Sequence, residues 1–206
     1  DPHHGTRDIW LLDLSRGGAS RLTFDPGADD MPVWSLDGRQ VAFKSERNRS
    51  FGFYQKSSSG SGPEELMLSG LNPGAVPYGW WRDGKLLVYS ASSPSLKAGE
   101  DDLWLLPWAG DRKPVPILQM PFSQVQGAVS PDGHWIAYVS AESGRGGQDE
   151  VYISPFPSGD GKRQVSVSGG VEPQWRRDGN ELFFLAGKRD LMGVEFDTER
   201  EFPPDD

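Results

Sequence analysis

Short apolar runs interrupted by an Asp-Gly pair recur along this chain. In the first, residues 32–45, Pro-Val-Trp precedes Asp37-Gly38 and Val-Ala-Phe follows it. An Asp-Gly pair between two apolar runs predicts a β-hairpin with a type I′ turn, whose two central residues both take positive φ. The same pattern predicts hairpins at residues 78–90, 127–140 and 173–186.

The predicted turns are almost evenly spaced. Their glycines are separated by 46, 49 and 46 residues, and an aromatic residue follows each glycine by five positions. The residues of the four turns are Asp37, Gly38, Asp83, Gly84, Asp132, Gly133, Asp178 and Gly179. A fixed period in the forties indicates a repeat protein. Because the aspartate recurs in every repeat, we assign it to the turn and not to a functional site.

The segments between the hairpins complete a four-stranded unit. After each hairpin comes a third strand and then a more polar outer strand. The third strands are of the type that residues 9–12 (Ile-Trp-Leu-Leu) show near the start of the chain. The third strands are apolar on both faces, so each needs a sheet packed on either side. Seventeen strands are expected in all, and the fold class is all-β, a β-propeller of four-stranded antiparallel blades. The propeller is expected at residues 8–196, between disordered tails at 1–7 and 197–206.

The number of blades stays open at this point. The two strands within residues 8–23 can complete the blade that begins at 173–186, which gives five blades. Alternatively, the chain is part of a larger propeller whose missing strands, and any targeting segment, lie upstream. An incomplete propeller would expose apolar blade faces and self-associate.

Composition excludes several classes of protein. The net charge of −9 argues against a nucleic-acid or anionic membrane partner, and no apolar run approaches the length of a membrane span. The 26 glycines and 17 prolines are spread so evenly that long helices are excluded. There is no cysteine, which suits a protein outside the cytoplasm without requiring it.

The sequence contains no recognisable catalytic or cofactor motif. It has no Gly-x-Ser-x-Gly elbow and no nucleotide-binding glycine pattern. Of its three histidines, His3 and His4 lie in a polar tail and His134 directly follows a turn. No acidic cluster has the spacing of a calcium loop. We therefore expect no catalytic residue, no cofactor and no metal.

The repeated phrases resemble a known family. Pro-Val-Trp-Ser-Leu-Asp-Gly at 32–38, Ser-Pro-Asp-Gly-His-Trp-Ile-Ala-Tyr at 130–138 and Asp-Ile-Trp-Leu-Leu at 8–12 resemble the WD-like repeat of TolB-type propellers. The chain as a whole resembles the propeller that follows the kinase domain in bacterial eukaryotic-like serine/threonine kinases. Leu36, Trp81-Arg82 and Arg176-Arg177 depart from the Ser-Pro of that repeat. The resemblance implies a periplasmic or other extracytoplasmic location.

Binding residues are expected on the loops. In propellers, two kinds of loop meet at one mouth of the channel. One kind leads from the outer strand of a blade to the first (inner) strand of the next blade, and the other leads from the second strand to the third within a blade. Loops on a rigid scaffold often carry binding residues. The first kind spans residues 24–32, 69–78, 119–127 and 167–173, and the second 45–50, 91–100 and 141–149. The candidate binding residues are Asp29, Asp30, Arg47, Arg49, Gln126, Glu142, Arg145 and Glu172, to which Asp25 and Gln124 in the same loops are added.

Three functions are compatible with these observations. The first is a non-catalytic binding or sensor module of a kinase or TolB-like protein, with a protein or peptide partner and a possible small ligand at the channel mouth. The second is the gating propeller of a prolyl-oligopeptidase-like or tricorn-like peptidase. The third is a propeller enzyme, such as a lyase or glycosidase, which would need carboxylates or histidines in the channel.

Overall fold

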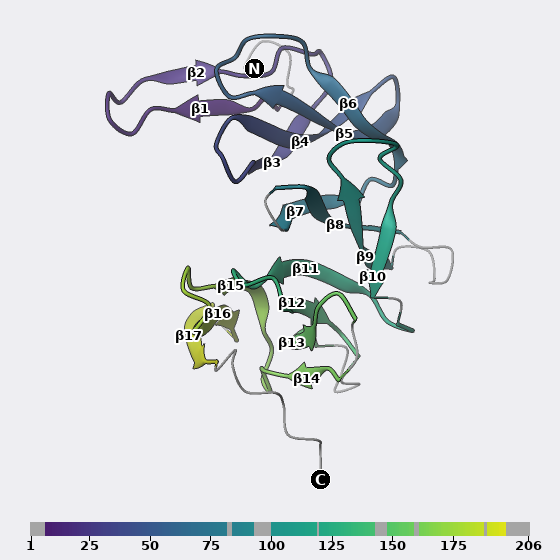
Figure 1. The fold of residues 1–206 in the computed structure, drawn as a ribbon, viewed down its shortest axis with the longest axis vertical. Helices are drawn as coiled ribbons and strands as arrows, with labels where there is room; N and C mark the ends of the chain where they lie inside the picture. The colour runs from purple at the N-terminus through teal and green to yellow at the C-terminus, as the bar shows by residue number, and fades with distance from the viewer. Residues whose placement is uncertain are drawn as a thin grey trace. The chain divides into compact units, whose positions relative to one another are not determined.

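The regular structure of the described part of the chain consists of short β-strands. A computed structural model describes residues 7–81, 84–92, 100–118, 120–142, 148–158, 161–187 and 189–196. These residues form seventeen strands and no helix, which confirms the all-β prediction (Figure 1). Within the described part, no helix is long and apolar enough to cross a membrane.

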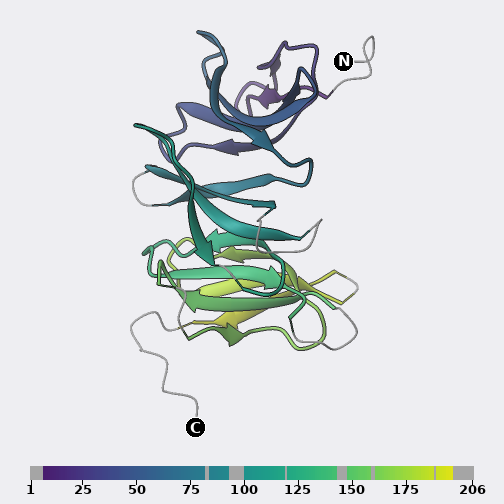
Figure 2. The ribbon, with the colours of Figure 1, turned by 90° about the vertical axis from the view of Figure 1, so that its right-hand side faces the viewer.

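The chain divides into two compact units, Asp1–Gln119 and Met120–Asp206. The first unit holds three antiparallel sheets, each following the order of its strands in the chain (Figures 1 and 2). A two-stranded sheet consists of β1 (Trp10–Leu12) and β2 (Ala19–Arg21). A four-stranded sheet consists of β3 (Asp29–Trp34), β4 (Gln40–Arg47), β5 (Ser50–Ser57) and β6 (Glu65–Leu71). The next consists of β7 (Val76–Trp81), β8 (Leu86–Ser92), β9 (Asp101–Pro107) and β10 (Val115–Leu118).

The second unit holds one four-stranded and one three-stranded sheet. The four-stranded sheet consists of β11 (Gln124–Val129), β12 (Trp135–Ser140), β13 (Glu150–Pro155) and β14 (Arg163–Gln164). The three-stranded sheet consists of β15 (Val171–Trp175), β16 (Glu181–Ala186) and β17 (Asp190–Glu195). The predicted limits of the propeller and of its tails stay a prediction, and residues 1–6 and 197–206 lie outside the described part.

Apolar side chains join neighbouring sheets within each unit. In the first unit, Phe53 and Ala42 pack with Leu87, Tyr89 and Leu106 of the following sheet. A second cluster joins the two-stranded sheet to its neighbour. In the second unit, Val139 and Ile153 pack with Leu182 and Phe184. Each core therefore lies between sheets, as in the blades of a β-propeller.

The third strands are not all buried as predicted. Strands β9 and β13 are buried on both faces over most of their length. In β1, by contrast, Trp10 and Leu12 are exposed, although Ile9 just before it is buried. The prediction is wrong for this strand because, among the described residues, only its Ile9 and Leu11 side packs against a neighbouring sheet, whereas the side with Trp10 and Leu12 is exposed.

The hairpin turns are not of the predicted type I′. Gly38, Gly133 and Gly179 have positive φ, but the aspartates before them do not. The N–H of Gly38 donates to the carbonyl of Ser35 at 2.9 Å, which places Leu36 and Asp37 at the centre of the turn. With no positive φ at these two residues the turn is of the type I class, followed by a left-handed glycine. Asp83 lies outside the described residues.

The three described aspartates close their turns with their side chains. Oδ1 of Asp37 accepts from the N–H of Arg39 at 3.0 Å and from the Ser35 hydroxyl at 2.7 Å. Asp132 accepts from the N–H of His134 and from the Ser130 hydroxyl in the same way. In the last turn, Asp178 accepts from the N–H of Asn180, and Nε of Arg176 replaces the serine hydroxyl at 2.8 Å. The departure from serine at this position thus preserves a donor to the aspartate.

Three first strands of these sheets contain the same backbone irregularity. In β3, β11 and β15 two residues lie opposite one residue of the next strand, which forms a β-bulge. The first residue of each bulge has positive φ although it is not glycine: Met31 (52°), Gln126 (55°) and Glu172 (56°). The residues opposite the bulges are Phe43, Tyr138 and Phe184, the aromatic residues that follow each turn glycine. The periodic aromatic therefore marks a bulge as well as a turn.

Candidate functional site

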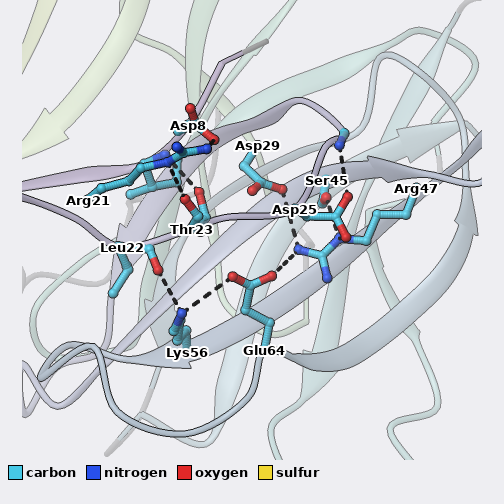
Figure 3. A network of polar contacts seen from close by, with 12 residues as sticks. Asp8, Arg21, Leu22, Thr23, Asp25, Asp29, Ser45, Arg47, Lys56 and Glu64 are labelled. Carbon is cyan, nitrogen blue, oxygen red and sulfur yellow. Dashed lines mark hydrogen bonds and ion pairs between the residues drawn. The ribbon is translucent and has the colours of Figure 1, made fainter. Parts of the chain in front are cut away.

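The predicted residues of the first loops converge on Arg47. Arg47 ends β4, Asp29 begins β3, and Asp25 lies in the loop before β3. The guanidinium of Arg47 lies 3.5 Å from carboxylate oxygens of both Asp25 and Asp29 (Figure 3). The same group donates to the Ser45 hydroxyl at 2.9 Å and stacks 3.9 Å from the ring centre of Tyr54.

Two members of this charge cluster were missed in the sequence. Glu64, just before β6, forms an ion pair and hydrogen bond with Arg47. Lys56 of β5 lies 3.5 Å from Glu64 and donates to the carbonyl of Leu22 at 2.8 Å (Figure 3). A lysine at a buried strand position, only 7% exposed, requires a partner. That requirement is the only sequence signal for the pair. The signal can be used only when it is known which face of β5 is buried.

Burial dominates the titration of Asp29. Its side chain is fully buried, and this desolvation raises the pKa of the carboxyl above its ordinary value. The Ser45 and Thr23 hydroxyls and the Arg47 guanidinium lower the pKa and offset only part of the rise. For Arg47, burial lowers the pKa, but Glu64, Asp29 and Asp25 together raise it above the ordinary value. The cluster therefore holds a permanent cation between carboxylates.

Asp30 forms a second, smaller group beside this cluster. Its carboxylate lies 3.0 Å from the Arg7 guanidinium and 3.7 Å from the ammonium of Lys44. Lys44 in turn donates to the carbonyl of Pro73, at the start of the next sheet, at 3.0 Å. Asp29, Asp30 and Arg47 are thus brought together at one end of β3 and β4.

The second unit repeats the cluster with opposite charges. Glu142 lies nine residues after Gly133, as Arg47 lies nine after Gly38. Glu142 is paired with Lys162, which directly precedes β14 as Glu64 precedes β6. At the position of Asp29, nine residues before the turn glycine, the second unit has the neutral Gln124. The cation Arg47 of the first unit thus corresponds to the anion Glu142 of the second, and the acidic Asp29 corresponds to the neutral Gln124.

The bulges bring together two further predicted residues. Gln126 and Glu172 occupy the positive-φ position of successive first strands, and Oε1 of Gln126 accepts from the N–H of Glu172 at 2.6 Å. Met31 holds the same position in β3 and is 45% exposed. The backbone of this position is repeated while its side chain changes.

Arg49 stands apart from these groups. It forms the tip of the β4–β5 hairpin with Asn48, and their φ values of 62° and 53° are those of a type I′ turn. Arg49 is exposed and takes no part in the Arg47 cluster. Arg145 lies outside the described residues.

The described part of the chain offers little reactive chemistry. No group of three or more histidine, aspartate or glutamate side chains within it could hold a metal ion. His134 is exposed and lies 3.4 Å from Asp132 of its own turn. The Arg47 cluster pairs two cations, Arg47 and Lys56, with the three carboxylates of Asp25, Asp29 and Glu64, and these ion pairs fix loops in place.

Comparison with known proteins identifies a fold. No protein-family model and no curated protein matches the sequence. TolB from Acinetobacter baumannii is a similar solved structure, with a TM-score of 0.72 and 21% identity over 91% of this chain and 46% of that chain. A putative TolB from Agrobacterium tumefaciens has a TM-score of 0.71 and 18% identity over 86% and 62%.

An enzyme is also among the similar structures. Oligogalacturonate lyase in complex with manganese has a TM-score of 0.68 and 13% identity over 88% of this chain and 54% of that chain. The chain thus spans about half to three fifths of the length of these three structures. At such identities the similarity concerns the fold alone: the chain has the fold of a β-propeller built from four-stranded antiparallel blades.

Proposed function

We propose that this chain is a non-catalytic binding module that recognises a protein or peptide partner through the loops at the bulged end of its sheets. The observation that carries the proposal is the contrast between backbone and side chain at the bulges. Met31, Gln126 and Glu172 share one unfavourable conformation, whereas their side chains are apolar, amide and acidic. Within the second unit, the hydrogen-bonded Gln126 and Glu172 place two of these side chains next to each other, as is expected of a recognition surface on a repeated scaffold.

The ion clusters support the same proposal. Arg47 and Glu142 each fix the end of a second strand to the loop before an outer strand. Loops held in this way lose less conformational entropy when a partner binds, which strengthens binding. Arg49, exposed at the tip of a rigid hairpin, offers the partner a positive charge.

The parent protein belongs to the proposal as well. The sequence phrases resemble the propellers of bacterial serine/threonine kinases and TolB, and solved TolB structures share the fold. We therefore place the module outside the cytoplasm, as part of a kinase or a TolB-like protein. Reading the full gene tests this part: a kinase domain upstream supports it, and an α/β-hydrolase domain would favour a gating propeller instead.

A display library of random twelve-residue peptides tests the binding activity itself. We expect enriched peptides to lose about tenfold in affinity when Glu172 or Gln126 is replaced by alanine, because each supplies one polar contact of about 1.4 kcal/mol. Arg39→Ala, at an exposed turn on the opposite end of β4, is the matched control and should have no effect. Equal binding by all variants would contradict the proposal, as would lyase or glycosidase turnover by the isolated chain.

A further inference from the structure

A pocket of about 890 Å³ lies in the first unit, at the turn end of two neighbouring four-stranded sheets. One wall is the β3–β4 turn with Leu36, and the other is formed by Leu86, Pro107 and Trp108. This position is at the opposite end of β3 and β4 from the Arg47 cluster. The pocket is therefore separate from the proposed recognition loops, and the inference does not rest on them.

The tryptophan contact beside the pocket differs from the corresponding contact in the second unit. In the second unit, Nε1 of Trp175 donates to the carbonyl of Ala128 in the neighbouring sheet at 3.0 Å. Trp34 and Trp80 are the equivalent residues of the first unit, and the buried Nε1 of Trp80 has no hydrogen bond in the described part of the chain. We compare Trp80, which contacts the pocket residue Trp108. The ring of Trp80 meets that of Trp108 edge to face, with centroids 4.2 Å apart. Trp108 lies in the connection between β9 and β10. Among the described connections between a third and an outer strand, only this one places a tryptophan against the tryptophan of the first strand of the same sheet.

The wall that carries Trp108 is held from two sides. The N–H of Trp108 donates to the carbonyl of Lys85 at 2.8 Å, which ties it to its own sheet. Its carbonyl accepts from Arg112 at 3.2 Å, and the same guanidinium donates to the carbonyl of Leu66 at 2.7 Å and to Glu65 at 2.6 Å. Because Leu66 and Glu65 belong to the other sheet, the arginine bridges the two sheets. These hydrogen bonds hold the two walls in place, which reduces the ordering that a ligand would have to impose.

The lining defines the chemistry of the occupant. Leu36, 65% exposed, faces this pocket together with the apolar side chains of Leu86, Pro107 and Trp108. Among the described residues of the lining, Asp37 supplies one carboxylate and Lys85 one ammonium group, so this part of the lining has no net formal charge. A volume of this size with mainly apolar walls is typical of small-molecule sites. An indole ring in the wall favours an aromatic partner over an aliphatic one.

We propose that this pocket binds an uncharged, planar aromatic small molecule, which packs against Trp108 and Leu36. The ligand gains from burying Leu36, which otherwise remains in contact with water. The balanced charge of Asp37 and Lys85 gives neither an anionic nor a cationic group an advantage. A further binding activity would thus be located at the turn end of the module.

Titration with 2-naphthol, followed by the indole N–H signals in NMR spectra, tests the proposal. We expect saturable shifts at Trp108 and Trp80 but not at Trp175, and a weaker response to naphthalene-2-sulfonate and to cyclohexanol. Leu36→Gln should weaken binding about fivefold, since it removes apolar contact from an exposed residue without disturbing the core. Leu14→Gln, the same change at an exposed leucine elsewhere in the unit, is the matched control.

The contradicting results are equally specific. No saturable shift with 2-naphthol, or equal weakening by Leu36→Gln and Leu14→Gln, would overturn the proposal. Tighter binding of cyclohexanol would overturn the aromatic preference. Trp108→Leu should weaken binding about tenfold, but because it removes a packing partner of Trp80, the decision rests on Leu36→Gln. Self-association of the chain that depends on Leu36, without a response to 2-naphthol, would make the pocket an interface and contradict the proposal.

Discussion

At the scale of single residues, chemically identical carboxylates have opposite effects on stability in this protein. Burial raises the pKa of Asp132, but the Ser130 hydroxyl and the N–H of His134 together bring it below its ordinary value. At Asp29 the balance is reversed, and burial keeps the pKa raised. Asp132 therefore stabilises the fold when ionised, whereas the ionisation of Asp29 costs stability.

This difference predicts a pH dependence for Asp29→Asn. Between the unfolded pKa near 3.8 and the raised folded pKa, the folded protein binds more protons, so the stability that Asp29 contributes falls as pH rises. We therefore expect the free energy of unfolding of Asp29→Asn to increase relative to that of the wild type as the pH rises from below 3.8 towards neutrality. Urea unfolding at several pH values measures it. Asp13→Asn should show the opposite trend, because the Ser15 hydroxyl lowers the pKa of Asp13, and parallel trends would contradict the assignment.

A second prediction at this scale concerns Arg49. The left-handed conformation of a non-glycine residue is unfavourable, and the second position of a type I′ turn favours glycine. Arg49→Gly should therefore stabilise the protein by about 0.5–1 kcal/mol, measured as a higher urea midpoint. Arg39→Gly, at a turn residue without positive φ, should not stabilise it. A stabilised Arg49→Gly that has lost peptide binding would show that the strained arginine is kept for function.

At the scale of elements, the charge-reversed clusters show how one blade design accommodates different sequences. Arg47 with Glu64, and Glu142 with Lys162, join the same two places in two sheets. The pairs differ in sign, and the residue at the position of Asp29 changes from acidic to neutral with them. These two sheets thus hold a paired charge at this place with either sign, whereas the sequence of the β7–β10 sheet has Ser93 and Pro114 at the corresponding positions.

The clusters lead to a stepwise prediction. Arg47→Glu should cost about 3 kcal/mol, because it places a fourth carboxylate beside Asp25, Asp29 and Glu64 with no guanidinium to balance them. Adding Glu64→Lys should restore part of the loss, and adding Asp29→Gln should restore more, since the triple variant copies the second unit. Urea unfolding of the three variants measures the series. Arg16→Glu, at an 87% exposed side chain, is the control, and a triple variant no more stable than Arg47→Glu would contradict the equivalence.

At the scale of the whole molecule, periodicity predicted the architecture better than the site. The strand number and the all-β class follow from the spacing of the Asp-Gly pairs, because regular turns leave few ways to arrange the apolar runs between them. The turn type was wrong since Asp-Gly fits two turn geometries that differ in the residue that carries positive φ. Glu64 and Lys56 were missed because their partners lie in other strands, and a pairing across strands depends on register. The Trp108 pocket was missed for the same reason.

The separate cores of the two units lead to the last prediction. Leu87 is fully buried in the core of the first unit, and Leu182 is almost fully buried in that of the second. Replacing either with alanine should cost about 2–4 kcal/mol, from lost burial and the cavity left behind. Amide hydrogen exchange should then show which strands lose protection. Leu87→Ala should speed exchange mainly in β3–β10, and Leu182→Ala should speed it mainly in β11–β17. Because stability is distributed in contiguous cooperative segments, this result would identify each unit as one such segment. Equal acceleration throughout the chain by both variants would instead mean that the propeller unfolds as a single cooperative body.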